Sequence, residues 1–339
     1  MLVADLKQRY DGITESSLEV QLGDLRVDDD ASRLLVGPGS DTFYYLDEKV
    51  ERSFGKYLGI PKAYLEKCDP EAKAWNLNHW FQRKANSSAV IESVGDQFVT
   101  VHKSGLVIVP LSRVLTIISD TLDPTYEVTN LERSDTLFQV DVITPHTVEI
   151  EPWEELEDRN PINHATVGDI THGGIRFRAN PTEVEAPVVQ TYLHRLWCLN
   201  GSTSPTKEGT IKLKGSTVDE VCDEIEAAMQ RVVGELDDKL TQYAALATRY
   251  PPGSKEAFAR QLGQEHKIPT RVLMHILDRI EILPEGASLY DILNVFTSVA
   301  NEEGVKWATI LKLQELGGAL AFDTDAVTHR CGTCERLLP

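Results

Sequence analysis

The sequence predicts an α+β protein, in which an antiparallel, hairpin-rich sheet is backed by a long helix and followed by a helical C-terminal region. Short runs of β-branched and aromatic residues, separated by turn-forming residues, fill positions 89–150. A long amphipathic pattern begins at Thr217, and helical spacing of apolar residues continues over 255–322. Strands that mostly follow one another directly favour an antiparallel sheet over a regular βαβ alternation.

Residues 1–85 are expected to form a mixed N-terminal region of short strands and helices. Apolar residues at helical spacing begin at Asp47 and predict a first helix, which Gly59 ends. Pro61 opens a second helix, because proline is tolerated in the first helical turn.

A third helix is predicted over residues 70–85. It carries a cluster of apolar and aromatic residues with one histidine: Trp75, Leu77, His79, Trp80 and Phe81. Because large side chains at such spacing usually pack inside a protein, we interpret this cluster as core.

Residues 86–250 are predicted to form the central α+β domain. Its strands over 89–150 surround one helix at 112–122, and an acidic loop over 149–161 separates them from a second block. In that block we expect a turn at Gly173-Gly174, a strand from Ile175 to Ala179, a helix through 188–199 and a strand over 209–215.

The long helix that backs the sheet is expected to begin after Thr217. Glu220 follows three residues later, which is the spacing of a capping box.

Residues 251–322 are predicted to be entirely helical, and residues 323–339 form a tail. The string over 258–277 has the helix, break and helix of a helix-turn-helix. Its second helix offers few polar side chains, so a plain helical hairpin is the favoured interpretation.

The composition is that of a folded, acidic protein. The chain has 339 residues, 53 acidic and 34 basic side chains, and a formal net charge of −19. This balance lowers the expectation of nonspecific nucleic-acid binding, which depends on lysine and arginine displacing counterions from phosphate. A basic groove on an acidic body is still possible.

We expect no secretory signal, because the N-terminal residues mix acidic and basic side chains with apolar ones, and no apolar run is long enough to cross a membrane. Five scattered cysteines are an odd number and do not resemble a disulfide framework. We therefore expect a cytoplasmic protein without membrane contact.

The sign of the charge changes locally over residues 159–217, where seven basic residues face four acidic ones. Phosphate contacts and base stacking would use the cations and aromatic residues of this block. The candidate nucleic-acid-binding residues are Arg176, Arg178, His194, Arg195, Trp197, Lys207, Lys212 and Lys214. Chance composition remains an open alternative for this patch.

The C-terminal tail contains the most metal-like string of the sequence. Cys331 and Cys334 have the CxxC spacing that zinc sites use, and His329 could be a third ligand. Zinc needs four ligands and no second CxxC exists, so a plain thiol pair is the alternative. No other cofactor is expected.

No phosphate-binding loop, dinucleotide fingerprint, nucleophile elbow or HExxH motif occurs in the sequence. The least implausible enzyme is a metal-dependent nuclease that uses His164, Asp169 and His172. A non-catalytic role is favoured.

The stretch GGIRFRANPTEVEAPVVQTYLHRLWCLNGST resembles the signature region of a phage- and plasmid-encoded family of unknown function, DUF family 932. Its distinctive part is an Arg-Leu-x-Cys-x-Asn-Gly box, here formed by Arg195, Leu196, Cys198, Asn200 and Gly201. Residues 288–302 are similar to a second segment of that family, whereas Trp197 departs from its pattern. The resemblance implies a phage or plasmid accessory protein made in a bacterial cell, with a layout similar to phage single-strand annealing proteins.

Two functions therefore remain as predictions. The first is a nucleic-acid-binding accessory of recombination or annealing, with single-stranded DNA as partner and a homo-oligomer as the expected assembly. The second is an acidic interaction module that acts on a host or phage protein.

Overall fold

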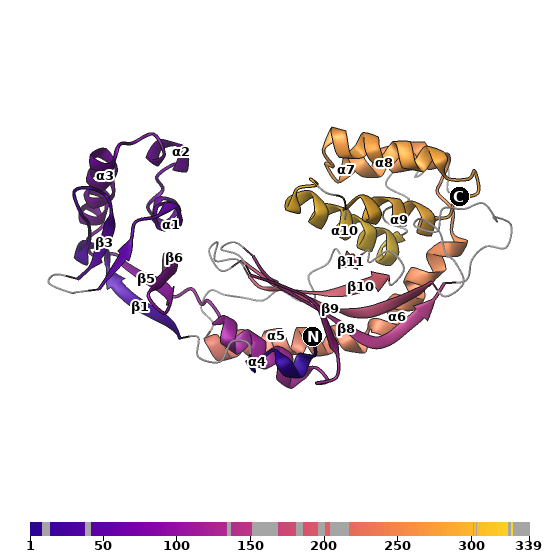
Figure 1. The fold of residues 1–339 in the computed structure, drawn as a ribbon, viewed down its shortest axis with the longest axis horizontal. Coiled ribbons are helices and arrows are strands. Elements are labelled where there is room, and N and C mark those ends of the chain that lie inside the picture. Colours follow the sequence, from indigo (N-terminus) through magenta and orange to yellow (C-terminus); the bar gives the residue numbers. More distant parts are fainter. Residues whose placement is uncertain are drawn as a thin grey trace, which may run out of the picture.

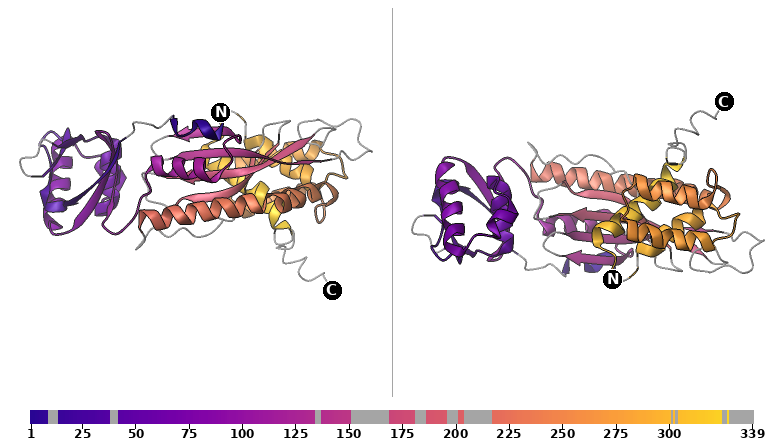
Figure 2. Two further views of the ribbon diagram at one scale, coloured as in Figure 1. Left: turned by 90° about the horizontal axis from the view of Figure 1, so that it is seen from below. Right: turned by 90° about the horizontal axis from the view of Figure 1, so that it is seen from above.

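The structure is a computed structural model of the chain. It describes residues 1–8, 14–37, 42–133, 137–150, 169–180, 186–195, 201–203, 217–300, 302, 304–324 and 327. It confirms the α+β class, with antiparallel sheets and a helical C-terminal region. Figures 1 and 2 show an N-terminal unit beside a larger body in which helices cover a curved sheet.

The N-terminal unit spans residues 14–105. One of its sheets has the strand order β1-β5-β6 and another the order β2-β3-β4. Its strands are β1 (Glu15–Gln21), β2 (Leu25–Val27), β3 (Arg33–Val36), β4 (Phe43–Tyr45), β5 (Ser88–Val94) and β6 (Gln97–Lys103). Its helices are α1 (Glu48–Leu58), α2 (Lys62–Leu65) and α3 (Pro70–Arg83), with the short 3₁₀ turn η3 (Leu22–Asp24).

The helix signals of this unit act as predicted. Asp47 caps α1 by accepting a hydrogen bond from the Val50 amide, and Gly59 ends the helix with φ +82°. A left-handed residue at this position is readily supplied by glycine, which has no Cβ.

The predicted boundary at residues 85/86 is wrong. β5 and β6 pair with β1 and β5 respectively, so residues 88–103 belong to the N-terminal unit. Ala89 and Ile91 pack into the same core as Phe54 and Phe81. This long-range pairing is not visible in local sequence patterns.

The central sheet has the strand order β11-β10-β9-β8-β7 and is antiparallel throughout. Its strands are β7 (Glu127–Arg133), β8 (Phe138–Glu149), β9 (Ile170–Ala179), β10 (Val188–Arg195) and β11 (Gly201–Thr203). The helices α4 (Leu111–Thr121) and α5 (Val218–Gly234) cover its lower face in Figure 1, together with the 3₁₀ turn η1 (Val3–Asp5).

The central sheet has one apolar face and one polar face, because successive strand residues point to opposite sides. Val140, Phe177 and Val189 lie on the apolar face and share a core with Ile225 and Met229 of α5. The polar face carries Gln139 and Asp141 of β8, Arg176 and Arg178 of β9, and Gln190, Tyr192 and His194 of β10.

The prediction of a helix through residues 188–199 is wrong where the structure describes it. Val188–Arg195 form β10, which pairs with β9 over its whole length, and all eight side chains are buried. A segment buried on both faces shows no strict alternation, so its apolar run did not distinguish a strand from a helix. Residues 196–200 lie outside the described residues.

The turn predicted at Gly173-Gly174 is also wrong, since both glycines lie inside β9. A Cβ atom on Gly174 would lie 2.1 Å from the Val142 carbonyl oxygen of β8. The close approach of the two strands, beside a register shift between Ile143 and Thr147, therefore requires glycine at position 174.

The helices of residues 255–322 lie above the polar face of the sheet in Figure 1, whereas Leu236 and Leu240 of the preceding helix lie against Gly173 on the other face. After α5 come α6 (Leu236–Ala244), η4 (Ala245–Thr248), α7 (Lys255–Glu265), α8 (Thr270–Ile282), α9 (Leu289–Ala300) and α10 (Trp307–Phe322). The predicted long helix is thus two helices that meet at Glu235. Every residue of α9 is buried, which places α9 at the centre of this layer.

Within the described part of the chain, no helix combines the length and the apolar character that a membrane crossing requires.

Candidate functional site

Arg176, a predicted phosphate contact, is enclosed in the protein. Its Nε and Nη2 donate hydrogen bonds to the Asp141 carboxylate at 2.7 and 2.8 Å, and its Nη1 donates to Gln314 Oε1 of α10 at 2.5 Å. The Tyr192 ring lies 4.7 Å from the guanidinium carbon. Arg176 is only 3% exposed, and its Nε, Nη1 and Nη2 atoms all donate to Asp141 or Gln314. It therefore cannot contact phosphate in this structure.

Arg195 is a second buried arginine, at the far end of β10. It is 1% exposed and donates from Nε and Nη2 to the Asp169 carboxylate at 2.7 and 2.5 Å. Tyr290 of α9 donates to the same carboxylate at 2.9 Å. Arg195 therefore joins the sheet to the helical layer, and its predicted contact with nucleic acid is wrong for the same reason as that of Arg176.

These contacts also separate the residues of the suggested nuclease site. Asp169 forms an ion pair with Arg195, whereas His172 Nδ1 lies 3.0 Å from the Thr144 carbonyl oxygen. An odd separation of three residues along extended chain places the two side chains on opposite faces. His164 lies outside the described residues, within which no group of three potential metal ligands comes together.

Arg178 and His194 are less tightly held but are also mostly covered. The Arg178 side chain is 19% exposed and pairs with Glu315 of α10 at 3.5 Å. Burial lowers the pKa of the His194 imidazole below its ordinary 6.5, and the neighbouring His172 lowers it further. His194 is therefore neutral near pH 7 and offers phosphate no charge.

The remaining predicted site residues lie outside the described residues. These are Trp197, Lys207, Lys212 and Lys214 of the central block, and the possible zinc ligands His329, Cys331 and Cys334 of the tail.

A different surface, on helix α3, combines exposed aromatic rings with basic side chains. Trp75 is 64% exposed, and its ring stacks on the His79 ring with centroids 5.1 Å apart and planes 15° apart. The prediction that Trp75 and His79 belong to the core is therefore wrong, since both are exposed. Leu77 and Phe81, on the opposite side of the helix, are the residues that enter the core.

Cations gather at the C-terminal end of α3. The guanidinium carbon of Arg83 lies 5.2 Å from the Trp80 ring centroid, and Lys84 Nζ lies 5.5 Å from it. The sequence contains no acidic residue between Glu71 and Glu92. Basic residues at a helix C-terminus are favourable to the helix dipole and make this end of α3 locally positive.

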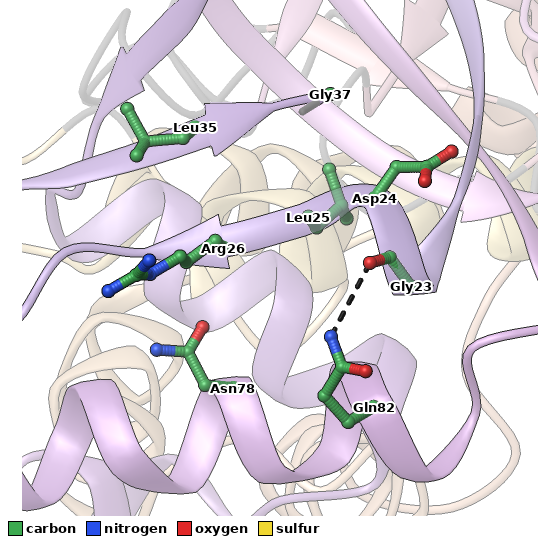
Figure 3. A pocket seen from close by; sticks show the side chains of 8 residues that line it. All are labelled: Gly23, Asp24, Leu25, Arg26, Leu35, Gly37, Asn78 and Gln82. Carbon is green, nitrogen blue, oxygen red and sulfur yellow. Dashed lines mark hydrogen bonds between the residues drawn. The ribbon is translucent and has the colours of Figure 1, made fainter. Parts of the chain in front are cut away.

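An open pocket of about 510 Å³ adjoins the same helix (Figure 3). Its lining comes from η3, from β2 and β3 with the residue that follows, and from α3: Gly23, Asp24, Leu25, Arg26, Leu35, Gly37, Asn78 and Gln82. Figure 3 shows Arg26 and Asp24 toward opposite ends of the pocket, with Asn78 and Gln82 along one side.

We name the exposed part of α3 the α3 surface and define it by Trp75, His79 and Arg83. A search for positive charge over the whole chain misses it, because it contains few cations. The signal that could have found it is the i, i+4 pair of Trp75 and His79 within a segment without acidic residues.

The chain was compared with known protein families, with curated proteins and with solved structures, and none of the three comparisons gives a match. The resemblance of residues 173–203 to DUF family 932 therefore stays a prediction.

Proposed function

We propose that this protein binds single-stranded nucleic acid through the α3 surface of its N-terminal unit. The observation that carries the proposal is the exposed Trp75 ring stacked on His79. The Trp75 ring is 64% exposed and stacks on the His79 ring, so a base can stack on it.

The chemistry of the surface suits a single strand better than a duplex. Base stacking on an aromatic side chain contributes about 1–3 kcal/mol per base, and it requires unpaired bases whose faces are accessible. His79 keeps the Trp75 ring in place from one side, so that a base can reach the other side. Arg83 follows His79 by one helical turn and is placed to contact the phosphate backbone.

The same proposal assigns an architectural role to the buried arginines of the central sheet. Arg176 and Arg195 join the sheet to α9 and α10, so the helical layer is held in a fixed position. Recombination or annealing is the process that the family resemblance implies for such a binding protein, with assembly into a homo-oligomer.

The test is a fluorescence-anisotropy titration with a labelled 20-mer of thymidine at low salt. We expect micromolar or tighter binding by the intact chain, and at least a five-fold loss in the variant Trp75→Ala, since the loss of one stacked base costs about 1 kcal/mol or more. Trp307→Ala is the matched control, because Trp307 is a partly exposed tryptophan at the start of α10 in the other body.

Salt dependence separates stacking from phosphate contact. Arg83→Gln should reduce the slope of log K against log salt by about one, whereas Trp75→Ala should leave that slope unchanged. Absence of binding by the intact chain at micromolar concentration, or equal losses in the Trp75 and Trp307 variants, would overturn the proposal. Binding of a protein partner by an otherwise nucleic-acid-free chain would support the acidic interaction module instead.

A further inference from the structure

Helix α3 carries the α3 surface and also supplies one side of the pocket of Figure 3. Asn78 and Gln82 line the pocket and follow Trp75 by three and seven residues, the spacing that places side chains on the same side of a helix. A strand whose base stacks on Trp75 can therefore place an adjacent nucleotide in the pocket.

One wall of the pocket is fixed by hydrogen bonds between α3 and β2. Asn78 Oδ1 accepts from the Val27 amide and Asn78 Nδ2 donates to the Val27 carbonyl oxygen, both at 2.8 Å. Gln82 Nε2 makes a longer contact of 3.4 Å with the Gly23 carbonyl oxygen, drawn as a dashed line in Figure 3. The pocket is thus preformed rather than created by its ligand.

The two charged side chains of the pocket remain accessible to a ligand. Arg26 is 68% exposed, and its pairing with Asp29 is long, at 3.6 Å. Asp24 is exposed as well, and among the described residues no side chain or amide bonds its carboxylate. The pocket therefore offers a cation toward one end and a carboxylate toward the other (Figure 3).

A carboxylate selects among the nucleobases, because it only accepts hydrogen bonds. Guanine presents two adjacent N–H donors, at N1 and N2, and can bind both carboxylate oxygens. Adenine and cytosine each present an amino donor next to a ring-nitrogen acceptor, and in thymine two carbonyl oxygens flank the single N–H donor. None of these three bases therefore presents two adjacent donors to the carboxylate. Guanine is thus the base that matches Asp24.

We propose that this pocket takes a guanine nucleotide of the bound single strand, with the base edge on the Asp24 carboxylate and a phosphate on Arg26. A volume of about 510 Å³ lies within the range of small-molecule sites and can hold one nucleotide. This inference rests on the proposed function, to which it adds a preference for guanine-containing strands.

The experiment compares three 20-mers of thymidine that differ only at one central position, which is thymidine, guanosine or inosine. Inosine keeps the N1–H donor of guanine and lacks the 2-amino group. We expect the guanosine oligonucleotide to bind about ten-fold tighter than the thymidine one, because a bidentate contact gives that order of discrimination, and inosine to lose most of the gain.

Asp24→Asn should abolish this preference and leave the affinity for the pure thymidine strand unchanged or slightly higher. Asp96→Asn is the matched control, because it removes one exposed carboxylate from the same unit, in the turn between β5 and β6, outside the pocket. Retention of the guanine preference in Asp24→Asn, or its absence in the intact chain, would overturn the pocket assignment alone.

Failure of the proposed function has a different signature. In that case the pure thymidine strand does not bind, and Trp75→Ala changes nothing. Titration with guanosine 5′-monophosphate then tests the pocket without the strand. If this nucleotide does not bind, or binds equally to the intact chain and to Asp24→Asn, the pocket assignment is overturned too.

Discussion

At the scale of single residues, the central arginines show how burial decides the role of a charge. A buried guanidinium is tolerated when its partners replace the hydrogen bonds and the charge compensation that water would supply. Arg176 has this compensation in Asp141 and Gln314, and Arg195 has it in Asp169. Arg178, at the less covered end of β9, pairs with Glu315 at the longer distance of 3.5 Å.

We predict that Asp141→Asn lowers the free energy of unfolding by about 3–5 kcal/mol, because it leaves the charge of Arg176 buried and uncompensated. The double variant Asp141→Leu with Arg176→Met should lose less than this single variant, since no buried charge remains. Urea denaturation followed by circular dichroism measures both changes.

Arg178→Met is the control for this pair of variants. Because the Arg178–Glu315 pair is longer and partly exposed, its loss should cost about 1 kcal/mol or less. An Asp141→Asn protein as stable as the Arg178 variant would contradict the structural role assigned to the Asp141–Arg176 pair.

At the scale of elements, local sequence signals define some helices and strands, whereas contacts between distant residues define others. The capping box before α5 is confirmed: Thr217 Oγ1 accepts from the Glu220 amide at 3.2 Å, and Glu220 Oε2 accepts from the Thr217 amide at 2.6 Å. The formation of β9 depends instead on its neighbouring strands. Gly174 shows this most clearly, because a Cβ atom at this position would meet the backbone of β8.

We predict that Gly174→Ala lowers the free energy of unfolding by about 3 kcal/mol or more, because the new methyl group meets a backbone carbonyl that cannot rotate away. Gly234→Ala, at the end of α5, is the control: a methyl group there meets nothing within 4 Å and should stabilise by up to about 1 kcal/mol. Thermal and urea unfolding of the two variants measure the difference, and equal stabilities would show that β8 and β9 do not approach as described.

At the scale of the whole molecule, the N-terminal unit has a core of its own. Its buried residues, from Val20 to Val101, form one cluster that contains no residue of the larger body. Contacts near their junction link the two parts. For example, the Glu15 carboxylate accepts hydrogen bonds from the amides of Leu111 and Ser112. A separate core of this size is the property of an independent domain.

We predict that residues 14–105 fold alone and unfold cooperatively. The isolated unit should show the circular dichroism of a mixed helix and strand protein and a single thermal transition, and the intact chain should show more than one. A fragment without a cooperative transition would contradict this division, which differs from the predicted boundary at residue 85.

The sequence by itself determined the features that depend on neighbouring residues. The α+β class, the start and end of α1, the helix α4, the strands β5 and β6 and the capping box before α5 all follow from periodicity, turn residues and caps. These signals act within a few residues of one another, so they survive without knowledge of the rest of the chain.

Only the tertiary structure decided which surfaces are covered. Residues 188–195 form a strand because they pair with β9, and Arg176 is internal because Gln314 of α10 lies over it. Arg195 is internal because Asp169, together with Tyr290 of α9, lies against it. Trp75 stays outside because α3 turns Leu77 and Phe81 inward. Burial depends on contacts between residues far apart in the chain, and a local pattern of aromatic or basic residues is the same whether the face is covered or exposed.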